Sequence, residues 1–315
     1  MNKNTLGSTG LSVSELCVGT LPMGPLQSNV PLEAGAEMLL AAMENGVNFF
    51  DSAQVYRTYP YLLKASKQFG GDIVITTKST AVDYKGMEDA VIEAMRELDR
   101  EYIDIFLLHC PRADETVFEK RAGALSALLK AKEKGYVRTI GISTHNPSLV
   151  AKAAQTPELD VVYPLINKLG LGILGSLPEM LEAIEKVHQS GKGMYAMKAL
   201  AGGHLVGEMV DSIAYVRAIP GMQAVSVGVT TVEELKLQLR IFNNEKIESS
   251  ELAGLKAKKQ IKVMPSLCTS CGTCVNTCPN GALSFVDKVP VADPGKCVLC
   301  GYCTPVCPEF AIRLK

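Results

Sequence analysis

The amino-acid sequence predicts an α/β protein, a closed (β/α)8 barrel followed by a small cysteine-rich domain. Between residues 16 and 242, short runs rich in β-branched residues alternate with longer amphipathic segments, which is typical of strands and crossover helices. Eight such units can be counted at about 28 residues each, close to the length of a βαβ repeat. Eight of the ten cysteines lie from Cys268 to Cys307, and this asymmetry predicts a separate second domain.

The predicted strands of the barrel are short, and amphipathic segments separate them. Strands are expected at residues 16–20, 48–51, 73–78, 103–108, 139–143, 161–164, 194–197 and 224–227. Helices are expected, among others, at residues 32–44, 86–98, 118–134, 177–188 and 232–241. The length fits a TIM barrel, for which about 250 residues is typical. An open doubly wound sheet is the alternative, but no G-x-G-x-x-G motif follows the first strand.

The chain changes character after residue 242. Residues 243–250 are polar, and residues 251–262 are rich in Ala, Leu and Lys, which indicates a linker and a bridging helix. We therefore expect a barrel domain at residues 1–242, the linker and helix at 243–262, and the cysteine-rich domain at 263–315.

Composition and charge exclude several classes of protein. Of 315 residues, 47% are hydrophobic and 21% charged, which excludes a disordered or fibrous chain. The net charge of −1 gives no sign of a polyanionic partner such as nucleic acid. No apolar run approaches the roughly 18 residues of a membrane span, and no secretory signal precedes the barrel. We expect a cytoplasmic protein that does not bind membranes and whose cysteines are reduced.

The C-terminal cysteines form an internal repeat. The pattern C-x2-C-x2-C-x3-C-P occurs at residues 268–279 and again at residues 297–308. This spacing resembles that of bacterial two-cluster ferredoxins, in which the fourth cysteine of each motif ligates the other cluster. The resemblance implies a small α+β ferredoxin-like iron–sulfur domain with two [4Fe-4S] clusters. One would be ligated by Cys268, Cys271, Cys274 and Cys307, and the other by Cys297, Cys300, Cys303 and Cys278.

A pair of structural zinc sites fits these cysteines less well. Such sites also use paired C-x2-C units, but they need neither the third cysteine nor the repeated Cys-Pro. Iron–sulfur clusters instead imply one-electron transfer, usually at low potential. Cys17 and Cys110, the two cysteines outside the repeat, are expected to be small buried side chains.

Polar side chains follow three consecutive predicted strands of the barrel. Asp51 and Tyr56 follow the second strand, Lys78 ends the third, and His109 follows the fourth. Each could have an ordinary structural role, such as a helix cap, a surface aromatic, a solvated strand end or a core imidazole. Chemistry in a (β/α)8 barrel lies at the carboxyl ends of the strands, so the four together predict an active site.

These four residues resemble the catalytic tetrad of the aldo/keto reductase family, in order and in strand position. The resemblance covers about residues 3–242. It implies that Tyr56 is the general acid, that the ammonium of Lys78 lowers the pKa of Tyr56, and that Asp51 orients Lys78 and keeps it charged. His109 would donate to the carbonyl oxygen of the substrate as negative charge develops there.

The family also binds a nicotinamide dinucleotide, and the corresponding positions match less well. Ser143 matches the serine that holds the carboxamide, while Met197 stands where a tyrosine stacks on the nicotinamide. Glu234 stands where NADPH-dependent members place an arginine, so we expect NADH to be preferred to NADPH, if either binds. The positions implied in dinucleotide binding are Gly19, Thr20, Ser143, Asn167, Met197, Lys198, Gly228, Thr230 and Glu234.

The sequence leaves three functional hypotheses. The first is an oxidoreductase that reduces a carbonyl or related group of a small molecule and exchanges electrons, through its clusters, with a partner protein. The second is an electron-transfer or sensory module whose barrel is a docking or ligand-binding scaffold, since fold alone does not imply activity. In the third, the clusters are structural and the barrel performs ordinary nicotinamide chemistry.

Overall fold

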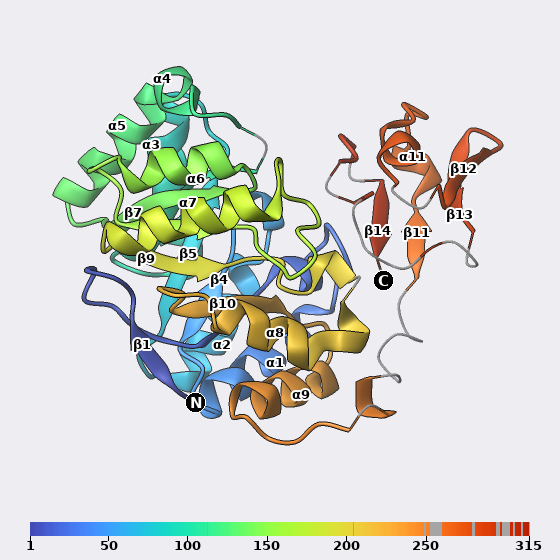
Figure 1. Ribbon diagram of the computed structural model, residues 1–315, viewed down its shortest axis with the longest axis horizontal. Coiled ribbons are helices and arrows are strands. Elements are labelled where there is room, and N and C mark those ends of the chain that lie inside the picture. Colours follow the sequence, from blue (N-terminus) through green and yellow to red (C-terminus); the bar gives the residue numbers. More distant parts are fainter. Residues whose placement is uncertain are drawn as a thin grey trace.

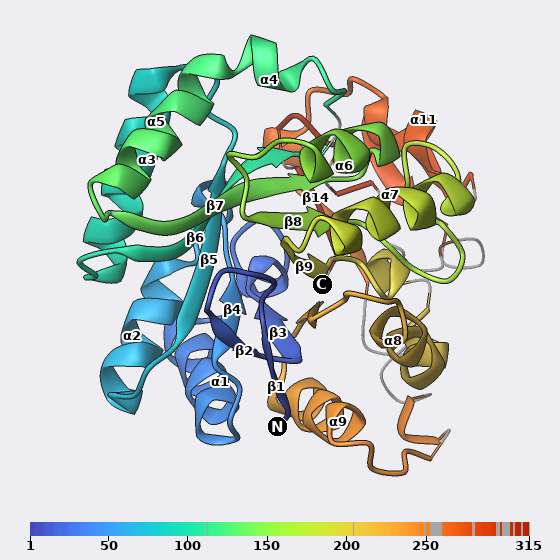
Figure 2. The ribbon, with the colours of Figure 1, turned by 60° about the vertical axis from the view of Figure 1, so that its left-hand side comes forward.

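A computed structural model of the chain confirms the barrel (Figures 1 and 2). It describes residues 1–111, 113–203, 205–248, 250–252, 260–278, 281–293, 297, 303–304, 306–309 and 311–314. Eight parallel strands close on themselves in the order β10-β3-β4-β5-β6-β7-β8-β9. They are β3 (Leu16–Gly19), β4 (Phe49–Asp51), β5 (Val74–Ser79), β6 (Ile103–Cys110), β7 (Val137–Thr144), β8 (Val161–Pro164), β9 (Gly193–Ala196) and β10 (Ala224–Gly228).

Helices surround the strands (Figure 2). Within the barrel, helices lie in each of the residue ranges where the sequence predicts one. They are α1 (Leu32–Glu44), α2 (Tyr59–Phe69), α3 (Tyr84–Leu98), α4 (Val117–Lys120), α5 (Ala122–Glu133), α6 (Pro147–Ala154), α7 (Leu177–Gln189), α8 (Met209–Arg217) and α9 (Val232–Phe242). Capping residues account for several starts. Ser176 and Glu179 form a reciprocal capping box before α7, and the Thr231 side chain accepts from the Glu234 N–H at α9. The helix expected at residues 118–134 is instead two helices that meet at Arg121.

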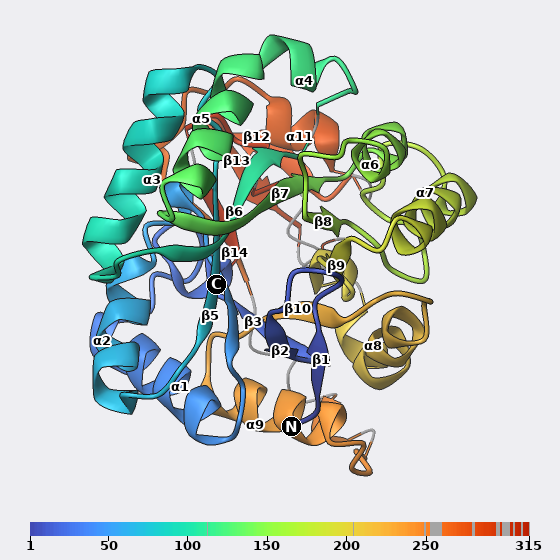
Figure 3. The same cartoon turned by 90° about the vertical axis from the view of Figure 1, so that its left-hand side faces the viewer.

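A hairpin that the sequence did not predict lies across the amino-terminal end of the barrel (Figure 3). Its strands are β1 (Lys3–Thr5) and β2 (Ser12–Ser14), which pair antiparallel. Leu6, in the connecting turn, is fully buried. Gly7 has φ +51, and a Cβ there would lie 2.2 Å from the Gly193 nitrogen, so only glycine fits this close approach.

The barrel is built around two apolar layers. One lies between the strands and the helices, and the other fills the barrel interior below the carboxyl ends of the strands. Polar side chains of the lower end tie strands together: Asp104 accepts from the Ile75 N–H at 3.0 Å, and Asp160 accepts from the Ile140 N–H at 2.9 Å. These bonds satisfy backbone donors that would otherwise be buried without partners. No described helix is both long and apolar enough to cross a membrane.

The cysteine-rich segment forms two small antiparallel ribbons. Strand β11 (Ile261–Val263) pairs with β14 (Ile312–Leu314), and β12 (Leu283–Val286) pairs with β13 (Val289–Ala292). One short helix, α11 (Thr273–Thr277), lies between them in the chain. In Figure 1 this segment lies at the end of the barrel opposite the β1–β2 hairpin. Most of the bridging helix expected at residues 251–262 lies outside the described residues, and its expected last two residues, 261 and 262, belong to strand β11 instead.

Candidate active site

Neighbouring strands bring the four tetrad residues to one end of the barrel. Asp51 is the last residue of β4, and Lys78 and His109 each lie one residue before the end of β5 and β6. Tyr56 ends the 3-10 turn η2 (Gln54–Tyr56), which begins three residues after β4. Since β4 pairs with β5 and β5 with β6, the three strands deliver their side chains to one place.

A buried ion pair forms the base of this group. The Lys78 ammonium donates to both carboxylate oxygens of Asp51, at 2.7 and 2.8 Å, and to the Ser52 carbonyl oxygen at 2.7 Å. Lys78 is 1% exposed and Asp51 is 4% exposed. A buried charge of either sign is stable only when it is paired and hydrogen bonded, and all three donors of the ammonium have acceptors here.

Tyr56 and His109 lie around this ion pair. The Lys78 nitrogen is 4.8 Å from the centre of the Tyr56 ring. The Tyr56 and His109 rings are 6.1 Å apart at their centres and perpendicular to each other. The structure therefore brings together the four residues that the sequence grouped, although they are up to 58 positions apart in the chain, from Asp51 to His109.

Burial dominates the electrostatics of these side chains. Burial raises the pKa of Asp51 and lowers that of Lys78, and each of the two charges opposes the shift of the other. Burial, and then the charges of Lys78, His145, Arg121 and Lys198, lower the pKa of His109 well below its usual value. The imidazole is therefore neutral at pH 7.

One electrostatic expectation from the sequence is wrong. The resemblance implied that Lys78 lowers the pKa of Tyr56, but burial, and then the Asp51 charge, raise the pKa of Tyr56 well above its usual value. The physical reason is that burial disfavours the phenolate, and the nearby Asp51 carboxylate adds a negative charge that disfavours it further. The phenol is therefore protonated throughout the neutral range.

The barrel contributes two tyrosines to the site that the sequence did not single out as catalytic. Tyr163 on β8 and Tyr195 on β9 stack with ring centres 3.9 Å apart. Hydrogen bonds from both phenols favour the charged form of Asp51, and the Tyr195 hydroxyl also bonds the Thr76 hydroxyl at 3.0 Å. An inward-facing tyrosine on a strand is usually assigned to the core, and its polar end is recognised only when the partner strand is known.

Ser143 has the features expected of a ligand contact. It lies opposite His109 in the pairing of β7 with β6. The Ser143 hydroxyl and His109 Nδ1 are both buried and have no hydrogen-bond partner among the described residues. Because buried polar atoms are rarely left unsatisfied, a bound group with donors and acceptors, such as a carboxamide, fits beside Ser143.

Asn167, implied in dinucleotide binding, is hydrogen bonded within its own loop. Its Oδ1 accepts from the N–H groups of Leu169 and Leu171, at 3.2 and 3.0 Å, and its Nδ2 donates to the Leu171 oxygen at 2.9 Å. The amide thus holds its own loop. Met197 and Lys198 follow β9, with Met197 bridged to Leu165 of the neighbouring strand segment. A role of these residues in dinucleotide binding stays a prediction.

The residues expected at the other end of the dinucleotide lie at the seam where β10 meets β3. Gly228 pairs with Gly19 in this sheet. A Cβ on Gly228 would lie 2.3 Å from Pro22, so there is no room for a side chain at this position. Beside it, the Glu234 carboxylate accepts from both the N–H and the hydroxyl of Thr230, each at 2.8 Å. A side-chain carboxylate thus occupies donors at the helix terminus, where an anion would otherwise bind.

Thr20, implied in dinucleotide binding, is fully buried next to Asp51. Its hydroxyl bonds the Asp51 carbonyl oxygen at 3.0 Å and the Thr58 hydroxyl at 2.7 Å. Thr58 in turn bonds the Ser52 hydroxyl at 2.9 Å. These hydroxyls connect the ends of β3 and β4 and hold the backbone that presents Asp51.

The described part of the cysteine-rich segment brings both motifs together. Buried Cys274 and Cys303 share one small core with Leu283 and Ile312. Burial raises the pKa of the Cys274 thiol, and the nearby thiols of Cys307 and Cys268 raise it further. Cys307 of the second motif thus lies near Cys274 of the first, as crossed ligation requires. Cys300 lies outside the described residues.

The two motifs also share a hydrogen-bond pattern. The Ala282 N–H donates to Cys278 Sγ at 3.3 Å, and the Ala311 N–H donates to Cys307 Sγ at 3.2 Å. Backbone donors of this kind favour thiolates in cluster sites. All described cysteines are free thiols, although no three ligating groups among the described residues converge on one metal position. The donor set fits iron–sulfur clusters, and Cys17 and Cys110 are buried as expected.

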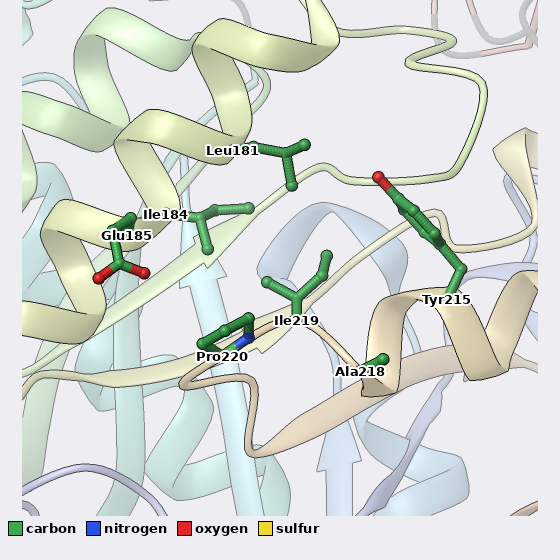
Figure 4. A pocket seen from close by; sticks show the side chains of 7 residues that line it. All are labelled: Leu181, Ile184, Glu185, Tyr215, Ala218, Ile219 and Pro220. Atoms are coloured by element: carbon green, nitrogen blue, oxygen red, sulfur yellow. The ribbon is translucent and has the colours of Figure 1, made fainter.

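A groove of about 410 Å³ lies on the outside of the barrel, between α7 and the segment after α8 (Figure 4). Its lining is mostly apolar and includes no tetrad or cluster residue. The lining residues are Leu181, Ile184, Glu185, Tyr215, Ala218, Ile219 and Pro220.

Comparison with known proteins agrees with both halves of the chain. A model of the aldo/keto reductase family matches residues 15–253, and a 4Fe-4S dicluster domain matches residues 267–311. An uncharacterized oxidoreductase of Bacillus subtilis is 22% identical over 82% of this chain and 96% of its own length. A methylglyoxal reductase of Escherichia coli is 24% identical over 50% of this chain and 60% of its own length.

A solved structure with the same barrel supports the fold. A putative aldo-keto reductase from Pseudomonas aeruginosa superposes with a TM-score of 0.66 at 23% identity, covering 79% of this chain and 96% of that one. The family match spans well over half of the chain. The chain therefore belongs to the aldo/keto reductase family, as an oxidoreductase that carries a 4Fe-4S dicluster domain after its barrel.

Proposed function

We propose that the tetrad reduces the carbonyl group of a small molecule, and that the C-terminal clusters connect this reduction to one-electron transfer with a partner protein. The observation that carries the proposal is the buried Lys78–Asp51 ion pair, with the Tyr56 ring over the ammonium and His109 edge-on to that ring. A charged pair this deeply buried has little value for stability alone. Its position beside a phenol and a neutral imidazole supports an acid–base function.

The four side chains divide the work of carbonyl reduction. Neutral His109 donates an N–H to the carbonyl oxygen and orients it. Tyr56, which stays protonated at neutral pH, gives its hydroxyl proton to that oxygen as negative charge develops there. The phenolate that remains is stabilised by the Lys78 ammonium, and Asp51 with the phenols of Tyr163 and Tyr195 keeps that ammonium fixed.

Two kinds of electron source fit the chain. A bound nicotinamide would supply a hydride, which carries both electrons and the hydrogen that the carbonyl carbon gains. A reduced [4Fe-4S] cluster would supply one electron at a time, so that route needs two deliveries and a second proton, taken from water, for the carbon. Ser143, with its unpartnered buried hydroxyl, would hold the nicotinamide carboxamide. The Glu234 carboxylate at the start of α9 would repel a 2′-phosphate, which favours NADH over NADPH.

The related methylglyoxal reductase suggests methylglyoxal, a 2-oxoaldehyde, as the first substrate to test. Anaerobically purified protein should reduce it with NADH, or with dithionite as the electron donor to the clusters. Tyr56→Phe should lower turnover by roughly 10²-fold, the usual scale for a positioned acid, without changing the iron content. Tyr84→Phe, at an exposed tyrosine of α3, is the matched control and should leave turnover unchanged.

A second candidate function has specific observations in its favour. Asn167 is committed to its own loop, and Glu234 occupies donors at the expected phosphate position. Both favour a barrel that no longer binds a dinucleotide and serves as a scaffold for the electron-transfer domain. Absence of NADH and NADPH binding, together with undiminished reduction by Tyr56→Phe, would select this scaffold function over the tetrad.

A further inference from the structure

Arg121 is a buried arginine at the junction of α4 and α5, where the sequence predicted one continuous helix. The helix break at this residue leaves its side chain only slightly exposed, with the whole residue 8% accessible. Arginine is rarely buried to this extent unless its guanidinium is fully engaged.

The guanidinium binds the carboxyl ends of two barrel strands. Its Nη2 donates to the Ser79 oxygen at 3.0 Å, at the end of β5, and its Nε donates to the Ala81 oxygen at 2.9 Å. Its Nη1 donates to the His109 oxygen at 3.1 Å and to the Cys110 sulfur at 2.9 Å, at the end of β6. One planar group thus spans both strand ends, which a lysine ammonium cannot do.

These acceptors adjoin the reactive side chains. Ser79 directly follows Lys78, and His109 is itself a member of the tetrad. None of these four acceptors is a carboxylate. A guanidinium kept for stability alone would more commonly be buried against a carboxylate, as Arg217 is against Glu15 at 2.7 Å.

We propose that Arg121 is a positioning residue for the reduction, which sets the spacing between Lys78 and His109 by fixing the ends of β5 and β6. The inference rests on the proposed function of the tetrad. A displacement of about 1 Å between reacting groups can cost about 10²-fold in rate, so a group that fixes two strand ends has a measurable effect on turnover.

The charge of Arg121 adds a second effect. Burial lowers the pKa of His109, and the positive charges that face it, on Lys78, His145, Arg121 and Lys198, lower it further. Removing the guanidinium charge therefore raises the pKa of His109. This change is visible in the imidazole itself, whether or not a substrate turns over.

The test compares Arg121→Met and Arg121→Lys with Arg217→Met in the iron-loaded full chain. Arg217 is the matched control, because its guanidinium is also largely buried and hydrogen bonded but contacts no tetrad residue. With methylglyoxal and NADH, kcat should fall about 10- to 100-fold in Arg121→Met, with KM nearly unchanged. Arg121→Lys should recover only part of the loss, and Arg217→Met should keep normal kcat.

Histidine-selective NMR completes the test without requiring turnover. The His109 ring signals, assigned with His109→Gln, should shift in Arg121→Met and titrate at higher pH, and should be unchanged in Arg217→Met. Unshifted His109 signals, or normal kcat in a variant that has only lost thermal stability, would overturn the proposal. Failure of the tetrad itself is recognised separately, by normal turnover of Tyr56→Phe.

Discussion

The barrel and the cysteine-rich domain are stabilised by different means. The barrel has a closed sheet, nine described helices and two apolar layers with dozens of fully buried side chains. The described core of the C-terminal domain centres on Cys274, Leu283, Cys303 and Ile312, and two of these four are expected cluster ligands. Domains this small rarely bury enough apolar surface to fold without staples or metals. We therefore expect the C-terminal domain to need its clusters in order to fold, and the barrel to fold without iron.

Removal of iron should have the largest effect and tests the comparison directly. The intact protein should contain about eight iron and eight sulfide per chain, as two [4Fe-4S] clusters require. A chelator under reducing conditions should unfold the C-terminal domain and leave the barrel folded, because metal binding is folding energy in such sites. Limited proteolysis should then yield a resistant fragment close to residues 1–242. Unfolding of the whole chain on chelation would break the comparison.

A single ligand should reproduce part of this effect. Cys274→Ser should lose the cluster expected to be shared with Cys268, Cys271 and Cys307, since Cys274 is buried and lies near Cys268 and Cys307. Cys110→Ser is the control, because Cys110 is buried in the barrel and bonded to Arg121. Iron analysis and visible absorption should show a loss in the first variant and none in the second. Stoichiometric zinc in the wild type, without charge-transfer absorption, would refute the cluster assignment.

The next effect concerns the buried Lys78–Asp51 ion pair inside the barrel. Lys78→Met leaves the Asp51 carboxylate buried without its cation, and breaking one half of a buried pair typically costs about 3–5 kcal/mol. The thermal midpoint should fall by several degrees, and turnover should be lost. Lys85→Met, which removes an exposed pair with Asp89, should change neither. A barrel equally tolerant of both substitutions would contradict the expected cost of leaving the Asp51 carboxylate buried and unpaired.

A pH experiment sharpens the comparison within the barrel. The pKa of His109 is lowered in the folded state, so the unfolded state binds a proton more readily. This contribution to stability is therefore present above the unfolded pKa of about 6.5 and is lost as the pH falls below it, by up to about 1.4 kcal/mol per pH unit. Between pH 7 and 5.5, the thermal midpoint of the wild type should fall more than that of His109→Gln. Equal decreases would show that His109 titrates normally.

The smallest effect is expected at the barrel surface. Glu234→Gln should improve NADPH binding relative to NADH by about tenfold, which corresponds to about 1.4 kcal/mol. Glu233→Gln, at the neighbouring position in the first turn of α9, is the control. Fluorescence titration of both dinucleotides measures the preference. Tighter binding of NADPH than of NADH by the wild type would contradict the proposed role of Glu234.

The sequence predicted the parts of the molecule that are local or repeated. All eight barrel strands were expected within a few residues, because each is a short apolar run, and the cysteine motif carries its spacing in the chain. The ends of the strands were predicted less closely. Strand β6 was expected to stop at residue 108 but continues to Cys110, so His109 belongs to the strand. The tetrad could be grouped because barrel strand ends meet at one edge.

Long-range contacts account for what the sequence did not predict. The burial of Leu6 depends on the close approach of Gly7 to Gly193. The helix break at Arg121 accompanies hydrogen bonds of its guanidinium to strand ends elsewhere in the chain. The hydrogen bonds of the Asn167 amide to its own loop also depend on the fold and are not written in the sequence pattern. The direction of the Tyr56 pKa shift depends on the burial of the phenol and on its distance from the Asp51 charge, and the amino-acid sequence alone gives neither.

Closure of the barrel through β10 and β3 also determines the order in which the two domains fold during synthesis. The barrel cannot close until β10, which ends at Gly228, has left the ribosome, and the first cluster cysteine, Cys268, is made only afterwards. Domains generally fold as units, the amino-terminal one first. Chains made without iron should therefore contain folded barrels, which protease resistance of nascent chains can test. Scarcity of iron would then reduce the fraction of molecules able to pass electrons, and leave the number of folded barrels unchanged.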